Sequence, residues 1–253
     1  MTLLLLVGFV SCKTVKTSSS PAPSATIASS TDIHLTPSDS PSSSYGQKPL
    51  NILFAGNSQL SAGGVPEAFD LLCKANNKNI QIYKVVYWGY TLSQIIDTMD
   101  IIKNPKDMDI VVLGDWSGVS GANELNSFKS LFSEHTKFYY IADNTMFGSN
   151  VYDTGGFIRI PTYEVRETML NDGFTMNQLQ AVDGMHWNFF NSYCMAICTY
   201  GVIYREDNDI TGIFRDMLYR AYRDTPGVTD DERDAALDKV YDVVAEVLGE
   251  TKW

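Results

Sequence analysis

Three residues of this sequence, Ser58, Asp183 and His186, have the types that nucleophilic catalysis by a hydroxyl group requires. A serine becomes a nucleophile when a neighbouring base accepts its proton and a third group orients that base. Asp183 and His186 lie three positions apart in AVDGMHWN, so one short loop could supply the base and its orienting group. Ser58 lies in NILFAGNSQLSAGG, residues 51–64, where an apolar run ends in a small polar triplet.

Each segment also has a simpler interpretation. A serine after an apolar run can be a turn residue, a helix N-cap or part of a phosphate-binding loop. The segment GNSQLSAGG lacks the lysine expected after a P-loop, which disfavours phosphate binding. Asp183 could cap the helix that follows it, and His186 could be structural.

The elements that must position these residues follow from the pattern of the chain. Short apolar runs predict strands at residues 51–56, 80–87, 108–115 and 137–143. Helical periodicity predicts helices at residues 64–77, 91–104, 123–135, 163–173 and 188–204, and a C-terminal helix that begins with a capping box at 229–232. This alternation is typical of a parallel sheet with helices on both faces.

Ligands bind at the carboxyl ends of the strands in open sheets of this kind. The segments that follow the four predicted strands are 56–58, 88–90, 114–116 and 143–144. Ser58 therefore lies at the expected ligand-binding edge. A strand-to-helix turn there can expose its hydroxyl, and nearby backbone N–H groups can stabilise an oxyanion.

The combination of Gly56-Asn57-Ser58 after the first strand with Asp183-Gly184-x-His186 before the last helices resembles the SGNH hydrolase family, also called GDSL-like esterases. The resemblance spans about residues 50–205. It implies a three-layer α/β/α sandwich with a mainly parallel, flavodoxin-like sheet. It also implies that Ser58 is the nucleophile, His186 the base and Asp183 its orienting group, with no metal ion and no organic cofactor.

The same resemblance implies an oxyanion hole formed by the backbone N–H groups of Ser58 and Gly89. The family carries an asparagine in its third motif, and Trp116 takes that place here. The Trp116 indole N–H could substitute, Asn123 or Asn144 could supply the amide, or the third donor is absent. Loss of one such donor typically costs about 10²–10³ in turnover. The sequence therefore leaves open a catalytically weak or inactive carbohydrate-binding protein on the same fold.

Aromatic residues flank the motif segments. Trp88, Tyr90 and Trp187 could contact sugar rings or acyl groups of a substrate, or they could pack beneath the loops.

The remaining cysteines are three in number: Cys73, Cys194 and Cys198. Because three is odd, at least one of these thiols stays outside any disulfide that they form. Cys194 and Cys198 share one helix face, for which we expect core packing, with a metal pair as the alternative.

Composition excludes some classes of partner. The chain has 253 residues, a net charge of −11 and 44% hydrophobic residues, enough for one domain with a sizeable core. An acidic chain without a basic cluster is a poor candidate for binding nucleic acid.

The N-terminal segment indicates export. LLLLVGFV, residues 3–10, is too short to span a bilayer and is typical of the apolar part of an export signal. Ser11-Cys12 follows and resembles the lipobox of bacterial lipoproteins, which implies cleavage before Cys12 and lipid attachment to its sulfur. An ordinary signal or a misplaced start codon is the alternative, because no Lys or Arg precedes the apolar run.

We therefore divide the chain into a signal peptide at 1–11, a lipidated Cys12 with a disordered Ser/Thr/Pro-rich tether at 12–48, and a hydrolase domain at 49–253. The predicted protein is a lipid-anchored ester hydrolase at the bacterial cell envelope or surface. Its expected substrate is an ester or acylated glycan, from which it removes acetyl or other short acyl groups. The sequence gives no indication of the oligomeric state.

Overall fold

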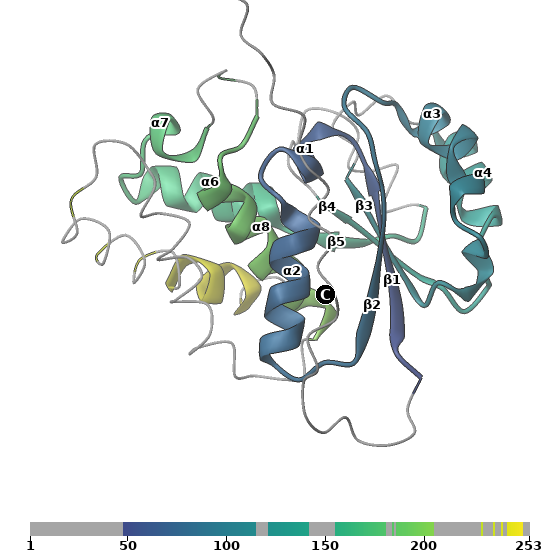
Figure 1. Ribbon diagram of the computed structural model, residues 1–253. Coiled ribbons are helices and arrows are strands. Elements are labelled where there is room, and N and C mark those ends of the chain that lie inside the picture. The colour runs from purple at the N-terminus through teal and green to yellow at the C-terminus, as the bar shows by residue number, and fades with distance from the viewer. Residues whose placement is uncertain are drawn as a thin grey trace, which may run out of the picture. The chain divides into compact units, whose positions relative to one another are not determined.

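A computed structural model describes residues 48–114, 121–141, 155–180, 184, 186–204, 229, 235, 239 and 242–249 (Figure 1). The elements in chain order are β1 (Leu50–Gly56), α1 (Ser58–Ser61), α2 (Val65–Ala75), β2 (Ile80–Val86), α3 (Leu92–Asp97), the 3₁₀ turns η1 (Met99–Ile101) and η2 (Pro105–Asp107), β3 (Ile110–Gly114), α4 (Ala122–Ser130), β4 (Lys137–Ile141), β5 (Ile158–Ile160), α6 (Thr162–Asn171), α7 (Met176–Leu179) and α8 (Phe189–Ile203). Residues 242–249 are also helical up to the last described position. No helix within these ranges is long and apolar enough to cross a membrane.

The described strands form one parallel sheet in the order β2-β1-β3-β4-β5. This is the flavodoxin-like order, in which the chain reverses direction across the sheet at β1 and β3. Gly56 at the end of β1 pairs in register with Val86 of β2 and Gly114 of β3. The carboxyl ends of these three strands therefore meet at one edge, as the sequence predicts.

The two faces of the sheet are covered by different helices, as Figure 1 shows. Ile52 and Phe54 of β1 belong to a core that includes buried residues of α2, α6 and α8. Leu53 and Ala55, which alternate with them, belong to a second core with residues of α3 and α4. Burial on both faces explains why the central strands read as continuous apolar runs. The three-layer α/β/α prediction is confirmed.

The helix predicted at 91–104 is shorter in the structure. Helix α3 ends at Asp97, the 3₁₀ turn η1 covers Met99–Ile101, and a second 3₁₀ turn, η2, follows after the end of the predicted range. Thr98 follows α3, with its hydroxyl donating to the Ile95 carbonyl oxygen at 2.8 Å. Strand β5 was not predicted, because three residues are too few to show a strand period.

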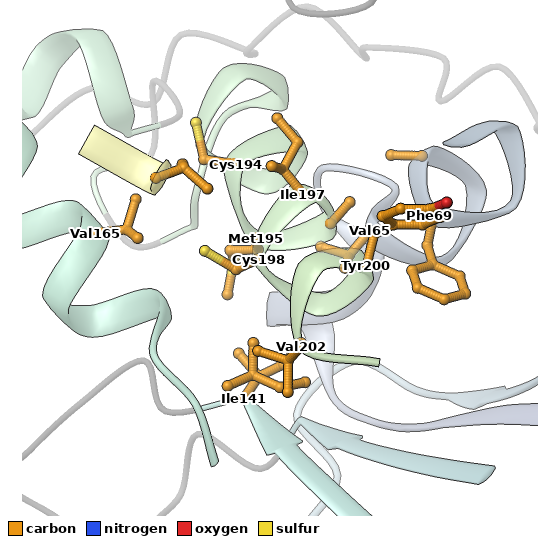
Figure 2. Close-up of a cluster of buried hydrophobic side chains, with 14 of the residues drawn as sticks. Val65, Phe69, Ile141, Val165, Cys194, Met195, Ile197, Cys198, Tyr200 and Val202 are labelled. Carbon is orange, nitrogen blue, oxygen red and sulfur yellow. The ribbon is translucent and has the colours of Figure 1, made fainter. Parts of the chain in front are cut away.

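Helix α8 is apolar on all sides and lies in the core between α2 and α6. Figure 2 shows Cys194 and Cys198 on the side of α8 that faces Val165 of α6. Both thiols are buried and neither forms a disulfide, in agreement with the predicted core packing. Within the described part of the chain, no group of three or more His, Cys, Asp and Glu side chains is arranged to hold a metal ion.

We expect the three core thiols to be inert toward a thiol reagent such as DTNB at pH 8 while the protein is folded. Burial raises the pKa of Cys73 and of Cys194 to about 12, and that of Cys198 well above its usual value. The reactive thiolate is therefore scarce. A Cys12→Ser chain should be labelled only after urea is added, and rapid labelling of the folded chain would contradict this burial.

Candidate functional site

Ser58 is the first residue of α1, directly after the turn that ends β1. Asn57 forms the N-cap, and its side-chain oxygen accepts a hydrogen bond from the Gln59 N–H at 3.1 Å. The Asn57 N–H donates to the Gly114 carbonyl oxygen at 3.3 Å. These bonds hold the half-buried Ser58 at the carboxyl edge of β1 and β3. The N-cap interpretation thus applies to Asn57 and not to Ser58.

Gly89 lies at the neighbouring end of β2. The Tyr87 N–H donates to the Gly56 carbonyl oxygen at 3.0 Å, which continues the pairing of β1 and β2 beyond the strand end. Gly89 follows with a φ of +71°, a backbone conformation that residues with side chains rarely adopt. The turns that carry Ser58 and Gly89 therefore leave the sheet side by side.

The backbone N–H groups of Ser58 and Gly89 are the two expected oxyanion donors. Among the residues that the structure describes, none accepts a hydrogen bond from either group. Ser58 starts a helix, where backbone N–H groups have no partner within the helix itself. With respect to the described residues, both donors are open to an oxygen atom of a ligand.

His186 lies against the exposed face of the Gly89 turn. Its imidazole ring contacts the indole of Trp88, with 4.7 Å between the ring centroids and 50° between the ring planes. Trp88 directly precedes Gly89 and is 63% exposed. This contact brings the predicted base to the same sheet edge as the predicted oxyanion donor.

The loop that carries His186 is held on its other side by α6 and α7. Trp187 is only 7% exposed and pairs with Gln180 in an isolated antiparallel bridge. Its ring lies 4.6 Å from the guanidinium of the buried Arg166. Asn188 then caps α8 and donates from its side chain to the Gln178 carbonyl oxygen at 2.6 Å. His186 is therefore anchored on both sides.

A second contact joins the Ser58 segment to the His186 segment. Gly63, in the turn between α1 and α2, packs directly on Ser192 in the first turns of α8. A β-carbon on Gly63 would lie 1.7 Å from the Ser192 hydroxyl oxygen and 3.1 Å from the Asn188 carbonyl oxygen. Only a glycine allows α1 to approach the start of α8 this closely.

The structure places the other candidate residues as follows. Asn123 is an exposed residue of α4, and no described contact links it to the Ser58 turn. Tyr90 stacks on Tyr87 at 4.9 Å and packs against the core under α3 and α4, so packing is favoured for it. Burial likewise favours packing for Trp187, whereas the exposed Trp88 remains available to a substrate. Four further candidates lie outside the described residues: Cys12, Trp116, Asn144 and Asp183.

Replacement of Trp88 by alanine should lower kcat by about 3- to 10-fold, the equivalent of one aromatic contact, because His186 loses the ring that holds it. Trp88→Phe should restore most of the rate. The melting temperature should change little, since Trp88 is mainly exposed. The rate of ester hydrolysis tests this, with the exposed Ile101→Ala as a control. A Trp88→Ala variant with unchanged kcat would rule out a positioning role.

No protein-family model matches this sequence, and no curated protein matches it either. Three similar solved structures are a DUF4886 family protein from Bacteroides uniformis (12% identity, 78% of this chain, 95% of that chain, TM-score 0.48), an esterase EstA from Pseudoalteromonas sp. (14%, 63%, 100%, 0.45) and a family 3 carbohydrate esterase from Clostridium thermocellum (16%, 60%, 94%, 0.40). At TM-scores below 0.5 these similarities carry no conclusion about activity.

Proposed function

We propose that this chain is a serine ester hydrolase of the SGNH type, with Ser58 as nucleophile, His186 as base and Asp183 as the group that orients His186. The observation that carries the proposal is the meeting of three segments at one sheet edge. Ser58 and Gly89 leave adjacent strands there, and the His186 ring contacts Trp88 beside them. A nucleophile, a base and two backbone donors are the components that acyl transfer requires.

The reaction follows from these roles. The Ser58 oxygen attacks the ester carbonyl carbon while the His186 imidazole accepts the hydroxyl proton. The carbonyl oxygen becomes an oxyanion, and the N–H groups of Ser58 and Gly89 donate hydrogen bonds to it. When the ester C–O bond breaks, the imidazolium gives its proton to the leaving alcohol. Water then attacks the acyl-serine with His186 again as base, which releases the acid and restores the Ser58 hydroxyl.

We further propose that the acyl group is acetyl or another short acyl group and that the alcohol belongs to a carbohydrate at the cell envelope. Two features support this substrate class. The exposed indole of Trp88 beside His186 offers an aromatic face of the kind on which sugar rings pack. The N-terminal segment with Cys12 indicates export and lipid anchoring, which would place the domain near envelope glycans.

Ester hydrolysis tests the function directly. The chain should hydrolyse p-nitrophenyl acetate faster than p-nitrophenyl octanoate and should release acetate from acetylated oligosaccharides. All of these activities should depend on Ser58. Equal rates for the parent and a Ser58→Ala variant would contradict the proposal. They would favour the alternative of an inactive carbohydrate-binding protein, for which the tryptophan at position 116 is the supporting sequence feature.

A further inference from the structure

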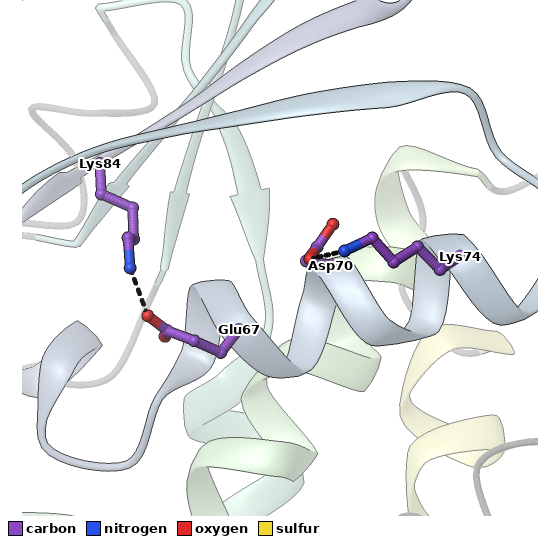
Figure 3. A network of polar contacts seen from close by, with 4 residues as sticks. All are labelled: Glu67, Asp70, Lys74 and Lys84. Carbon is purple, nitrogen blue, oxygen red and sulfur yellow. Dashed lines mark hydrogen bonds and ion pairs between the residues drawn. The ribbon is translucent and has the colours of Figure 1, made fainter. Parts of the chain in front are cut away.

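A groove of about 420 Å³ opens beside the Ser58 turn, between α2 and the edge strand β2. Its apolar lining comes from Ala62, Pro66, Val86 and Tyr87. Its polar lining includes Glu67 of α2 and Lys84 of β2, which form an ion pair at 2.5 Å across the groove (Figure 3). The size lies at the lower end of the range for sites that hold small organic ligands.

The groove adjoins both segments that carry the proposed oxyanion donors. Ser61 and Ala62 line it, and the Ala62 N–H and the Ser61 hydroxyl donate to the Ser58 carbonyl oxygen at 2.8 and 3.4 Å. Ser61 lies three residues after Ser58 in α1, so the groove begins about 4.5 Å along the helix axis from Ser58. On the opposite wall, Tyr87 lies two residues before Gly89. A group bound in the groove would thus lie about the length of one sugar ring from the reacting carbonyl carbon.

The charged lining decides which half of an ester the groove fits. Lys84 and Glu67 are both about half exposed, at 51% and 56%, so solvent reaches both charged groups. An aliphatic acyl chain in the groove would displace that water without replacing its hydrogen bonds, which is costly. A sugar offers hydroxyl groups that can accept from the Lys84 ammonium and donate to the Glu67 carboxylate. Its C–H surface can pack on Pro66 and Tyr87.

The ligand should also carry no net charge. Lys84 and Glu67 neutralise each other within the groove, so neither sign is favoured locally. The whole chain carries a net charge of −11, which opposes the approach of an acidic polymer.

Building on the proposed esterase function, we propose that the groove lined by Pro66, Glu67, Lys84 and Tyr87 is a sugar subsite. It binds the alcohol half of the substrate, a neutral saccharide, next to the acylated hydroxyl.

The test compares Lys84→Met and Glu67→Gln with the matched variants Lys74→Met and Asp70→Asn. Lys74 and Asp70 form an ion pair at 2.6 Å on the same helix α2 but do not line the groove (Figure 3). All four variants should fold, because exposed ion pairs contribute little to stability. The substrates are acetylated tetrasaccharides of glucose, xylose and mannose, together with p-nitrophenyl acetate and p-nitrophenyl octanoate.

The groove variants should lose about tenfold more kcat/KM on at least one acetylated tetrasaccharide than on p-nitrophenyl acetate, mainly through a higher KM, and the control variants should lose neither. An equal loss on all substrates, a selective loss on the octanoate, or the same loss in the controls would overturn the sugar subsite.

Binding of the deacetylated tetrasaccharides to Ser58→Ala protein, measured by NMR, tests the groove without turnover. Binding that is weakened by Lys84→Met and not by Lys74→Met would support the subsite even in a chain without esterase activity. Binding that both variants leave unchanged would overturn it while leaving the esterase function intact.

Discussion

Replacement of Ser58 by alanine is expected to lower kcat for p-nitrophenyl acetate at least about 10³-fold while leaving the melting temperature nearly unchanged. Removal of a serine nucleophile alone can cost as much as removal of its whole catalytic triad, about 10⁶-fold in a well-studied protease. The smaller bound allows for slow attack on this activated ester by other groups. Stability should hold because Asn57, not Ser58, caps α1.

The matched control is Ser130→Ala. Ser130 is an exposed residue of α4 on the opposite side of the sheet, and its hydroxyl donates to the Ser127 carbonyl oxygen at 2.7 Å. This variant should retain the parent rate. If Ser58→Ala and Ser130→Ala hydrolysed the ester equally fast, Ser58 would not be the nucleophile.

Replacement of Gly63 by alanine is expected to lower kcat about 10²-fold and to destabilise the protein by about 1–3 kcal/mol. The new methyl group would lie 2.2 Å from the Ser192 β-carbon, a contact that no side-chain rotation relieves. The α1–α2 turn and the start of α8 must then separate, at the cost typical of an overpacked core. Because Ser58 and His186 lie on these two segments, a shift near 1 Å is enough for such a loss of rate.

A double variant tests this explanation against a general loss of folding. Gly63→Ala combined with Ser192→Gly removes the clashing side chain and should recover most of the rate, although glycine within α8 itself costs about 1 kcal/mol. Gly249→Ala serves as a control, because a β-carbon there meets no atom within 4 Å. If Ser192→Gly gives no recovery in the Gly63→Ala background, the contact between Gly63 and Ser192 does not couple the two segments.

The sequence was sufficient to predict the parts of the fold that have a local period. Strands β1, β3 and β4 are mostly apolar runs because both faces of the sheet are covered there, whereas the edge strand β2 is only partly buried. Helices α2 and α6 show helical spacing over at least ten residues, and α8 is a long apolar run. Strand β5 is too short for such a pattern. The break after α3 depends on a backbone turn at Thr98, in a stretch whose apolar spacing continues through Met99, Ile101 and Ile102.

The candidate site divides in the same way. Residue type and position after a strand indicated Ser58, the three-residue spacing from Asp183 indicated His186, and the family resemblance implied Gly89. The contacts that hold them are tertiary and leave no local signal. The tilted contact of Trp88 with His186 joins residues 98 positions apart in the chain, and Gly63 contacts Ser192, 129 positions later. The glycine pair Gly63-Gly64 in SAGG was the sequence signal that could have indicated a close approach at Gly63.

The burial of Trp187 shows why aromatic residues next to a motif are ambiguous in sequence. Trp88 and Trp187 each lie beside a predicted site residue, yet one is exposed and the other is packed under the loop by Arg166. The difference arises because Trp187 is followed within two residues by the buried helix α8, whereas Trp88 lies in an exposed turn on the way to α3.

The central claim, a nucleophilic serine at position 58, is tested most directly by covalent trapping. The folded protein is incubated with a fluorophosphonate, digested, and the modified residue is located by mass spectrometry. We predict a single phosphonylated serine, Ser58, with no adduct in Ser58→Ala protein and much slower labelling in His186→Gln protein. An unlabelled Ser58 in the parent protein, or an adduct that forms equally fast without His186, would contradict the claim.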